Sequence, residues 1–207
     1  ARELLEACPA KWRNWEWYYV HRLCNSELLN LQHTGGIASI RYSPDGLHIV
    51  TTSGDGKVWI WNAETGDLIK SWNAGRVLRL DISPDGRRIV TGDRDGFLTV
   101  WDKSGKLIRK WKAHNRLLWS VAFSPDGKRI ANIGGRSVRV WDAESGELLF
   151  LLDDHFPNAY AVSFSPDGDR IATAGQTLMI WDESGSEIDV IQPPRLMCHR
   201  HNIMRME

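Results

Sequence analysis

Residues 43–62, SPDGLHIVTTSGDGKVWIWN, contain the pattern that decides the fold of this chain. The pattern is a Ser-Pro-Asp-Gly turn followed 16 to 18 residues later by Trp-Asp or Trp-Asn, and it occurs four times. The turns begin at Ser43, Ser83, Ser124 and Ser165, and the tryptophans, spaced 40 residues apart, are Trp61, Trp101, Trp141 and Trp181. Self-similarity at a period of this length indicates a repeat architecture. Such architectures usually build binding surfaces, so the pattern favours a binding function over a catalytic one.

Each copy of the pattern predicts four short antiparallel strands. In the first copy we expect strands at residues 37–42, 48–52, 57–61 and 67–72, separated by turns that contain Gly. The Pro, Asp and Gly of each Ser-Pro-Asp-Gly suit successive positions of a type I turn, and Asp55-Gly56 suits a hairpin loop that needs a positive φ. The β-branched residues between the turns favour strands. The other copies place their first strands at residues 77–82, 118–123 and 159–164.

The composition narrows the classes of partner. The 207 residues include 26 basic and 26 acidic side chains, so the formal net charge is zero, and we expect no nucleic-acid partner. The three cysteines form no paired framework, which predicts a reducing compartment and a cytoplasmic location. No apolar run approaches the roughly 20 residues that a membrane span needs, so we expect no membrane association. No sequence feature indicates a cofactor.

Four strands per 40 residues with a terminal Trp-Asp resemble the WD40 repeat, which forms the blade of a β-propeller. The resemblance predicts an all-β fold with a propeller region at residues 25–191 and blades at about 32–72, 73–111, 112–152 and 153–191. Residues 26–31 match the fourth strand of a blade without its first three strands. In this family such a strand usually completes the last blade, yet residues 187–191 already supply that blade with its own. Because seven blades are usual, we expect an incomplete propeller that is truncated at both ends.

The resemblance also implies a hydrogen-bonded chain of Asp, His, Ser or Thr, and Trp in each blade. Carried over by position, its members are His33, Thr51, Asp55 and Trp61 in blade one, Thr91, Asp95 and Trp101 in blade two, His114 and Trp141 in blade three, and His155, Thr173 and Trp181 in blade four. Blade three has Asn132 at the hydroxyl position, and blades three and four have shorter hairpins that lack the Asp. A His, Asp and Thr set can suggest catalysis, but a catalytic triad is not needed once per blade. We therefore expect a structural network, no catalytic residue and no enzyme activity.

The two flanks differ from the repeats. Residues 1–24 have a helical composition and resemble the linker that precedes WD repeats in large planctomycete-type bacterial proteins, many of which carry a Ser/Thr protein kinase domain upstream. No kinase signature occurs in the chain itself. Residues 192–207 are expected to form an irregular tail. Their Cys198, His199 and His201 lack the paired ligand spacing of a zinc site, so we predict no metal.

The family resemblance implies a partner-binding surface at the rim of the channel, with two positions per blade just before and within the first strand. Blade one has only the small Gly36 and Ala38 at these positions. The remaining candidates are Arg76, Leu78, Leu117, Trp119, Asn158 and Tyr160. Trp, Tyr and Arg are enriched at binding hot spots, so Trp119, Tyr160 and Arg76 are the leading candidates. The alternative is that Trp119 only fills the channel wall.

The sequence thus predicts a non-catalytic scaffold that binds a protein or peptide, as part of a larger bacterial signalling protein. One alternative is a substrate-docking or regulatory region of a multidomain Ser/Thr protein kinase whose catalytic domain lies upstream. Another is a structural repeat fragment that self-associates through its open edges, because an open arc of blades leaves sheet surfaces uncovered.

Overall fold

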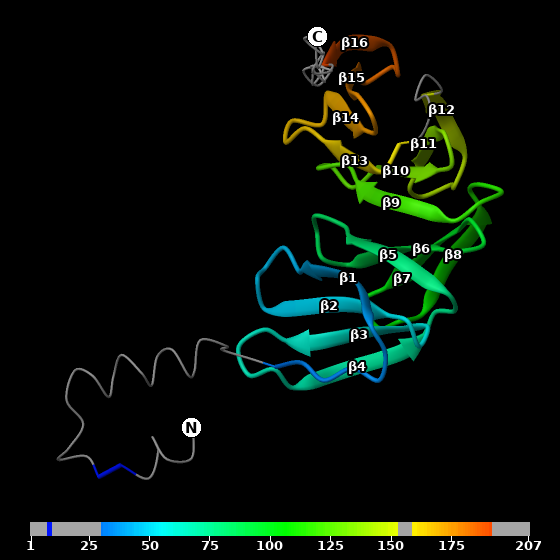
Figure 1. Ribbon diagram of the computed structural model, residues 1–207. Coiled ribbons are helices and arrows are strands. Elements are labelled where there is room, and N and C mark those ends of the chain that lie inside the picture. The colour runs from blue at the N-terminus through cyan, green and yellow to red at the C-terminus, as the bar shows by residue number, and fades with distance from the viewer. Residues whose placement is uncertain (1–7, 10–29, 153–158, 192–207) are drawn as a thin grey trace, which may run out of the picture.

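The computed structural model describes residues 8–9, 30–152 and 159–191, and within these residues the chain is all β. Sixteen strands form four antiparallel sheets of four strands each, and every sheet contains four consecutive strands (Figure 1). The predicted all-β fold with four four-stranded blades is therefore confirmed. The predicted helical segment at 1–24, the strand at 26–31 and the tail at 192–207 lie almost entirely outside the described residues. No helix in the described ranges is long and apolar enough to cross a membrane.

The strand bounds follow the sequence prediction to within one or two residues. The first sheet contains β1 (Ile37–Tyr42), β2 (His48–Ser53), β3 (Lys57–Asn62) and β4 (Leu68–Asn73). The second contains β5 (Val77–Ile82), β6 (Arg88–Asp93), β7 (Phe97–Asp102) and β8 (Leu107–Lys112). The third contains β9 (Leu118–Phe123), β10 (Arg129–Gly134), β11 (Ser137–Asp142) and β12 (Leu148–Leu152). The fourth contains β13 (Ala161–Phe164), β14 (Arg170–Ala174), β15 (Leu178–Asp182) and β16 (Glu187–Ile191).

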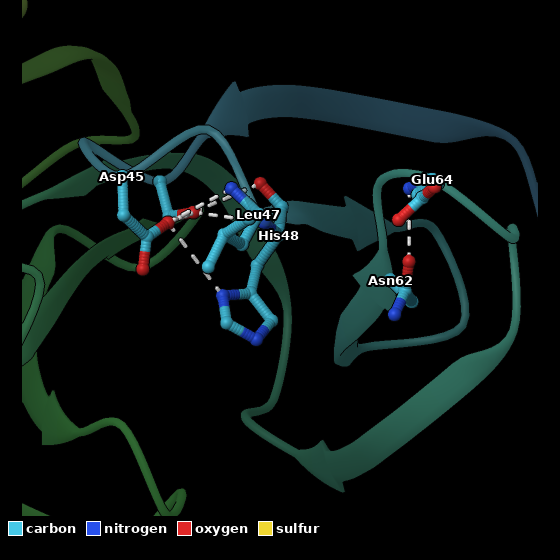
Figure 2. A network of polar contacts seen from close by, with 6 residues as sticks. Asp45, Leu47, His48, Asn62 and Glu64 are labelled. Atoms are coloured by element: carbon cyan, nitrogen blue, oxygen red, sulfur yellow. Dashed lines mark hydrogen bonds and ion pairs between the residues drawn. The ribbon is translucent and has the colours of Figure 1, made fainter.

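Each Ser-Pro-Asp-Gly segment closes the hairpin between the first two strands of its sheet. At the first turn the hydroxyl of Ser43 donates to Asp45 at 2.5 Å and accepts the backbone N–H of His48 at 2.9 Å. Figure 2 shows the carboxylate of Asp45 facing Leu47, whose N–H it accepts at 2.9 Å, and the imidazole of His48. The hydrogen bond from Ser43, followed by that from Leu47, lowers the pKa of Asp45 below its usual value. Gly46 takes the positive φ of 72° that ends the turn.

The apolar core lies between consecutive sheets. Val50, Val58 and Ile60 of the first sheet form a buried cluster with Leu80, Ile82 and Ile89 of the second. Similar clusters join the second sheet to the third and the third to the fourth. The fourth strands of the first two sheets each carry a tryptophan that meets the repeat tryptophan of the next sheet, in the pairs Trp72–Trp101 and Trp111–Trp141. Each sheet is thus stabilised mainly by its immediate neighbours, as in other repeat proteins.

In the part of the chain that the structure describes, no other sheet packs on the face of the first sheet that carries Ile40, although Leu31 and His33 contact the tryptophans of that face. By strand register, Ile40, Leu80 and Val121 occupy the same position in the first three blades. Leu80 and Val121 are 1% and 3% exposed because they pack against the preceding sheet, whereas Ile40 is 50% exposed. Figure 1 shows the four sheets in a row, with the first and the fourth at opposite ends. Among the described residues, the sheets therefore form an open arc.

Candidate interaction surface

The first blade contains three of the four residues of its predicted network in one hydrogen-bonded chain. The indole N–H of Trp61 donates to the hydroxyl of Thr51 at 3.1 Å, and that hydroxyl lies 2.7 Å from Nε2 of His33. The carbonyl oxygen of Leu31 lies 3.1 Å from Nδ1 of His33 and can only accept, so Nδ1 is the donor. In the neutral imidazole with this tautomer, Nε2 accepts the hydroxyl proton of Thr51.

Asp55, the fourth predicted member, does not meet His33. Its carboxylate accepts hydrogen bonds from the hydroxyls of Thr34 and Ser53, and from the N–H of Lys57 at 3.1 Å. These donors come from its own hairpin and from the loop before β1. Asp55 therefore ties two loops together, while the His33 chain holds the interior of the blade.

In the second blade the carboxylate that closes the hairpin is Asp93, which the sequence prediction missed. Oδ1 of Asp93 accepts the N–H of Asp95 at 2.9 Å and that of Phe97 at 2.8 Å. The predicted Asp95 is exposed. The predicted pair of this blade is joined, since the indole N–H of Trp101 donates to Thr91 at 2.9 Å. The only sequence signal for Asp93 is its position, which corresponds to that of Ser53 at the end of the second strand.

The third blade has an incomplete network around His114. The indole N–H of Trp141 donates to Oδ1 of Asn132 at 2.6 Å, and His114 is 5% exposed. Nε2 of His114 and Nδ2 of Asn132 have no hydrogen-bond partner in the described part of the chain. Burial, followed by the charge of Arg139, lowers the pKa of His114 to about 4, so the imidazole is neutral at pH 7. In the fourth blade Trp181 donates to Thr173 at 2.7 Å, and His155 lies outside the described residues.

The structure brings two of the predicted partner-binding residues into contact. The rings of Trp119 and Tyr160 meet edge to face, with centroids 6.0 Å apart and planes at 84°. Trp119 is 39% and Tyr160 51% exposed, so neither ring is enclosed in a core. With Arg116, Leu117 and Gly135 they line a hollow of about 340 Å³.

Arg76 and Leu78 line a separate hollow of about 410 Å³, together with Asp55 and Arg94. The structure thus divides the described part of the predicted surface in two, an aromatic part and a charged part. Asn158 lies outside the described residues.

Comparison with known proteins assigns the repeats. The family model of the WD domain, G-beta repeat, matches residues 25–62, 66–102, 105–142 and 146–182. The chain belongs to the WD40 repeat family. Domains of this family are typically protein-interaction scaffolds and are usually non-catalytic. No protein with curated annotation matches the chain.

A solved WD40-type structure shows the same fold. The structure of U3-55K is similar with a TM-score of 0.70 and 22% sequence identity. The similarity covers 78% of this chain and 53% of the U3-55K chain, so the present chain spans about half the length of that protein. At this identity the likeness concerns the fold alone.

Within the WD40 blades, Arg79 holds the aromatic surface in place, and the sequence prediction missed it. Its guanidinium donates to three backbone carbonyls: Trp119 at 2.8 Å, Leu78 at 3.0 Å and Ala38 at 3.2 Å. These carbonyls belong to β9, β5 and β1, so one side chain joins the first strands of three WD40 blades. The sequence did show a charged residue inside the strand VLRLDI. It did not show the role of Arg79, because the carbonyls of Trp119 and Ala38 lie about 40 residues away in the sequence.

Asp81 bridges the same three strands from a second position. Its carboxylate accepts the N–H of Phe123 on β9 at 2.7 Å and lies 3.3 Å from Nε of Arg41 on β1. Burial raises the pKa of Asp81 above its ordinary value, against the opposing effect of these partners. Arg79 and Asp81 therefore brace the inner strands on which the WD40 partner-binding surface rests.

Proposed function

We propose that this WD40 domain binds a protein or peptide partner at the surface formed by Trp119 and Tyr160, and that it serves as a non-catalytic scaffold in a larger bacterial signalling protein. The observation that supports the proposal is the exposed aromatic pair. Aromatic side chains offer large contact areas at low conformational entropy cost, and Trp and Tyr are enriched at binding hot spots. Arg79 holds the backbone of Trp119 in place before a partner arrives, which reduces the ordering cost of binding.

The proposed setting is cytoplasmic, without a nucleic-acid or membrane partner and without a cofactor. A second candidate function is favoured by residues 1–24, whose resemblance to the linker of kinase–WD proteins points to a regulatory or substrate-docking region of a Ser/Thr protein kinase. The two candidates share the binding surface and differ in the protein that carries it.

Selection of a peptide-display library tests the surface directly. The library is selected on the wild-type domain, and the recovered peptides are tested on the Trp119→Ala/Tyr160→Ala double variant. The control is Leu107→Ala/Ile108→Ala, because both residues are equally exposed apolar side chains on the outer strand β8. We expect the peptides to bind the wild type and the control and to lose at least about tenfold in affinity on the double variant. Equal binding to all three proteins, with unchanged circular dichroism, contradicts the proposal.

Self-association through the open ends is a third candidate, with a second copy of this chain as the occupant. Leu178 of the fourth sheet is 37% exposed, whereas Val58, Leu98 and Val138 at the same position are fully buried against the next sheet. In the first two sheets, the residue at the Leu178 position packs against the next sheet, on the face that carries the equivalent of Ile40. The exposed face of the fourth sheet therefore matches the Ile40 face of a second copy. Sedimentation velocity at micromolar concentration distinguishes the cases: a dimer that Ile40→Glu dissociates supports self-association, and a monomer excludes it.

A further inference from the structure

A cavity of about 470 Å³ lies between the first two sheets, at the turns that follow β1, β5 and β7. A volume of this size is within the range of small-ligand sites, about 300 to 1,000 Å³. The cavity lies where the first strands end, whereas Trp119 lies near the start of β9, so the aromatic surface is at the other end of the strands. Its floor is apolar, with side chains from both sheets: Val50, Ile60, Ile82 and Ile89.

An arginine bridges the equivalent gap between each later pair of sheets. Between the second and the third sheet, Nη2 of Arg88 donates to the carbonyl of Gly127 at 2.7 Å. Cζ of the same arginine lies 5.5 Å from the centre of the Phe123 ring. The same two contacts recur between the third and the fourth sheet at 2.7 Å and 5.4 Å, and their residues are Arg129, Gly168 and Phe164. In both places an arginine of one sheet thus covers the turn of the next.

The gap between the first two sheets lacks both parts of this arrangement. By strand register, His48 has the position of the two arginines and Ile82 that of the two phenylalanines. Nδ1 of His48 lies 3.7 Å from Asp45 of its own turn (Figure 2), and no described residue donates to the carbonyl of Gly86. The turns are placed alike, because a Cβ on Gly86 would lie 3.8 Å from Cδ of Pro44, compared with 3.5 Å and 3.6 Å at the other two gaps. The cavity is therefore the space that an arginine and a phenylalanine occupy elsewhere in this chain.

Two carboxylates beside the cavity can receive a cation. Oδ1 of Asp45 and Oδ1 of Asp85 each accept a serine hydroxyl and a backbone N–H of their own turn. No hydrogen-bond donor of the described chain contacts Oδ2 of either residue. The hydrogen bond from Ser43 lowers the pKa of Asp45, and that from Ser83 lowers the pKa of Asp85. Both side chains are therefore charged at neutral pH.

Three basic side chains, Lys70, Arg87 and Lys103, also line the cavity. The first two positions are basic in the next blade as well, where the guanidinium of Arg88 is nevertheless bound. Lys103 has the position of Ala143, since the N–H of each donates to the carbonyl that follows the Ser-Pro-Asp-Gly turn of its blade. Lys103 is thus the charge in this gap that opposes a guanidinium and has no counterpart in the next gap.

We propose that the cavity between the first two sheets binds an arginine side chain of a peptide partner. The guanidinium donates to the carbonyl of Gly86 and faces the carboxylates of Asp45 and Asp85, while its methylene stem packs on Ile82. Arginine suits this site because its planar group offers several donors in fixed directions and is weakly hydrated. The site does not rest on the aromatic surface, from which it is separated by the length of the strands.

The first test titrates the tripeptide acetyl-Gly-Arg-Gly-amide into the full chain and follows the backbone resonances of Gly86 and Arg87. We expect saturable shifts, and binding at least about fivefold weaker for the citrulline tripeptide, which has nearly the same shape without the charge. Lys103→Ala should tighten binding at least about threefold, because it removes the opposing charge. Trp119→Ala/Tyr160→Ala should bind the tripeptide as the wild type does. No saturable shift, or binding that the aromatic double variant removes, overturns the site and leaves the proposed function untouched.

The second test rebuilds the internal arrangement in the first gap. His48→Arg/Ile82→Phe introduces the two residues of the later gaps, so tripeptide binding should fall at least about tenfold while the urea midpoint stays at or above that of the wild type. The matched control is Leu47→Arg, which adds the same charge to the same turn on a side chain that is 63% exposed, and it should bind normally. Unchanged binding by the rebuilt variant, or equal loss in the control, overturns the site. Lys103 is exposed, so Lys103→Ala decides the question if the rebuilt variant does not fold. Tighter binding of acetyl-Gly-Glu-Gly-amide at the same resonances overturns the choice of a guanidinium.

Discussion

The open end of the arc predicts unequal costs for the same kind of truncation in adjacent blades. Leu80 and Ile40 occupy equivalent positions on β5 and β1, but Leu80 is buried between two sheets and Ile40 is half exposed. Both side chains contain four carbons, and both lose three of them on substitution by Ala. The comparison therefore isolates the effect of the neighbouring sheet.

The expected magnitudes follow from burial. Leu80→Ala removes three fully buried carbons, at about 0.8 kcal/mol each, and leaves a cavity between the first two sheets, for a total of roughly 3 to 4 kcal/mol. Ile40→Ala removes carbons that are half in water already and leaves no enclosed cavity, so we expect about 1 kcal/mol. Val121→Ala, at the buried equivalent position of the third blade, should cost about 2 to 3 kcal/mol.

Urea unfolding followed by tryptophan fluorescence measures these differences. Because repeat units are coupled mainly through their neighbours, hydrogen exchange should also show that Leu80→Ala releases β1–β4 selectively. An Ile40→Ala cost equal to that of Leu80→Ala would refute the open arc, since it would mean that another surface covers Ile40 in solution.

Two further predictions concern the third blade and the inner strands. Gly134→Ala should destabilise the domain by about 3 kcal/mol in urea unfolding, because the new Cβ would lie 2.3 Å from Cγ of His114; Gly36→Ala, with no atom within 4 Å, should change stability by less than about 0.5 kcal/mol. Burial raises the pKa of Asp81, so its protonated form is favoured in the folded state, and the contribution of Asp81 to stability should fall as the pH rises from 3.8 through the raised pKa. Asp81→Asn should remove this contribution, because an amide does not titrate while its oxygen still accepts the N–H of Phe123, so the difference in unfolding free energy between variant and wild type should change over that pH range; a difference that is independent of pH contradicts this account.

The sequence predicted the blades because their determinants are local. Each Ser-Pro-Asp-Gly turn is closed by hydrogen bonds within six residues, as those of Ser43 and Asp45 show. The alternating residues between the turns then form the strands, whose bounds agree with the prediction to within one residue, except that β13 begins at Ala161, two residues late. The contact of Trp119 with Tyr160 follows from their equivalent positions in successive repeats.

The residues that the sequence could not assign act between blades or depend on the details of a loop. Arg79 and Asp81 have partners about 40 residues away, and no periodic pattern indicates which strands such groups join. Asp55 has the expected position but accepts a hydrogen bond from Thr34 instead of His33. Both ring nitrogens of His33 are already engaged, with the carbonyl of Leu31 and the hydroxyl of Thr51. The shorter hairpin of the third blade was visible in the sequence. The hollow of about 530 Å³ that His114 and Arg139 line was not, because it lies between that hairpin and the loop before β9.

The most direct test of the account is ¹⁹F NMR of the domain labelled with 5-fluorotryptophan, titrated with a peptide recovered from the display selection. The chain has 11 tryptophans, and Trp119→Phe assigns the resonance that matters. We predict that the Trp119 resonance shifts on binding, while those of the blade tryptophans such as Trp61 and Trp141 do not. Saturable binding that leaves Trp119 unchanged and shifts other tryptophans would contradict the assignment of this surface.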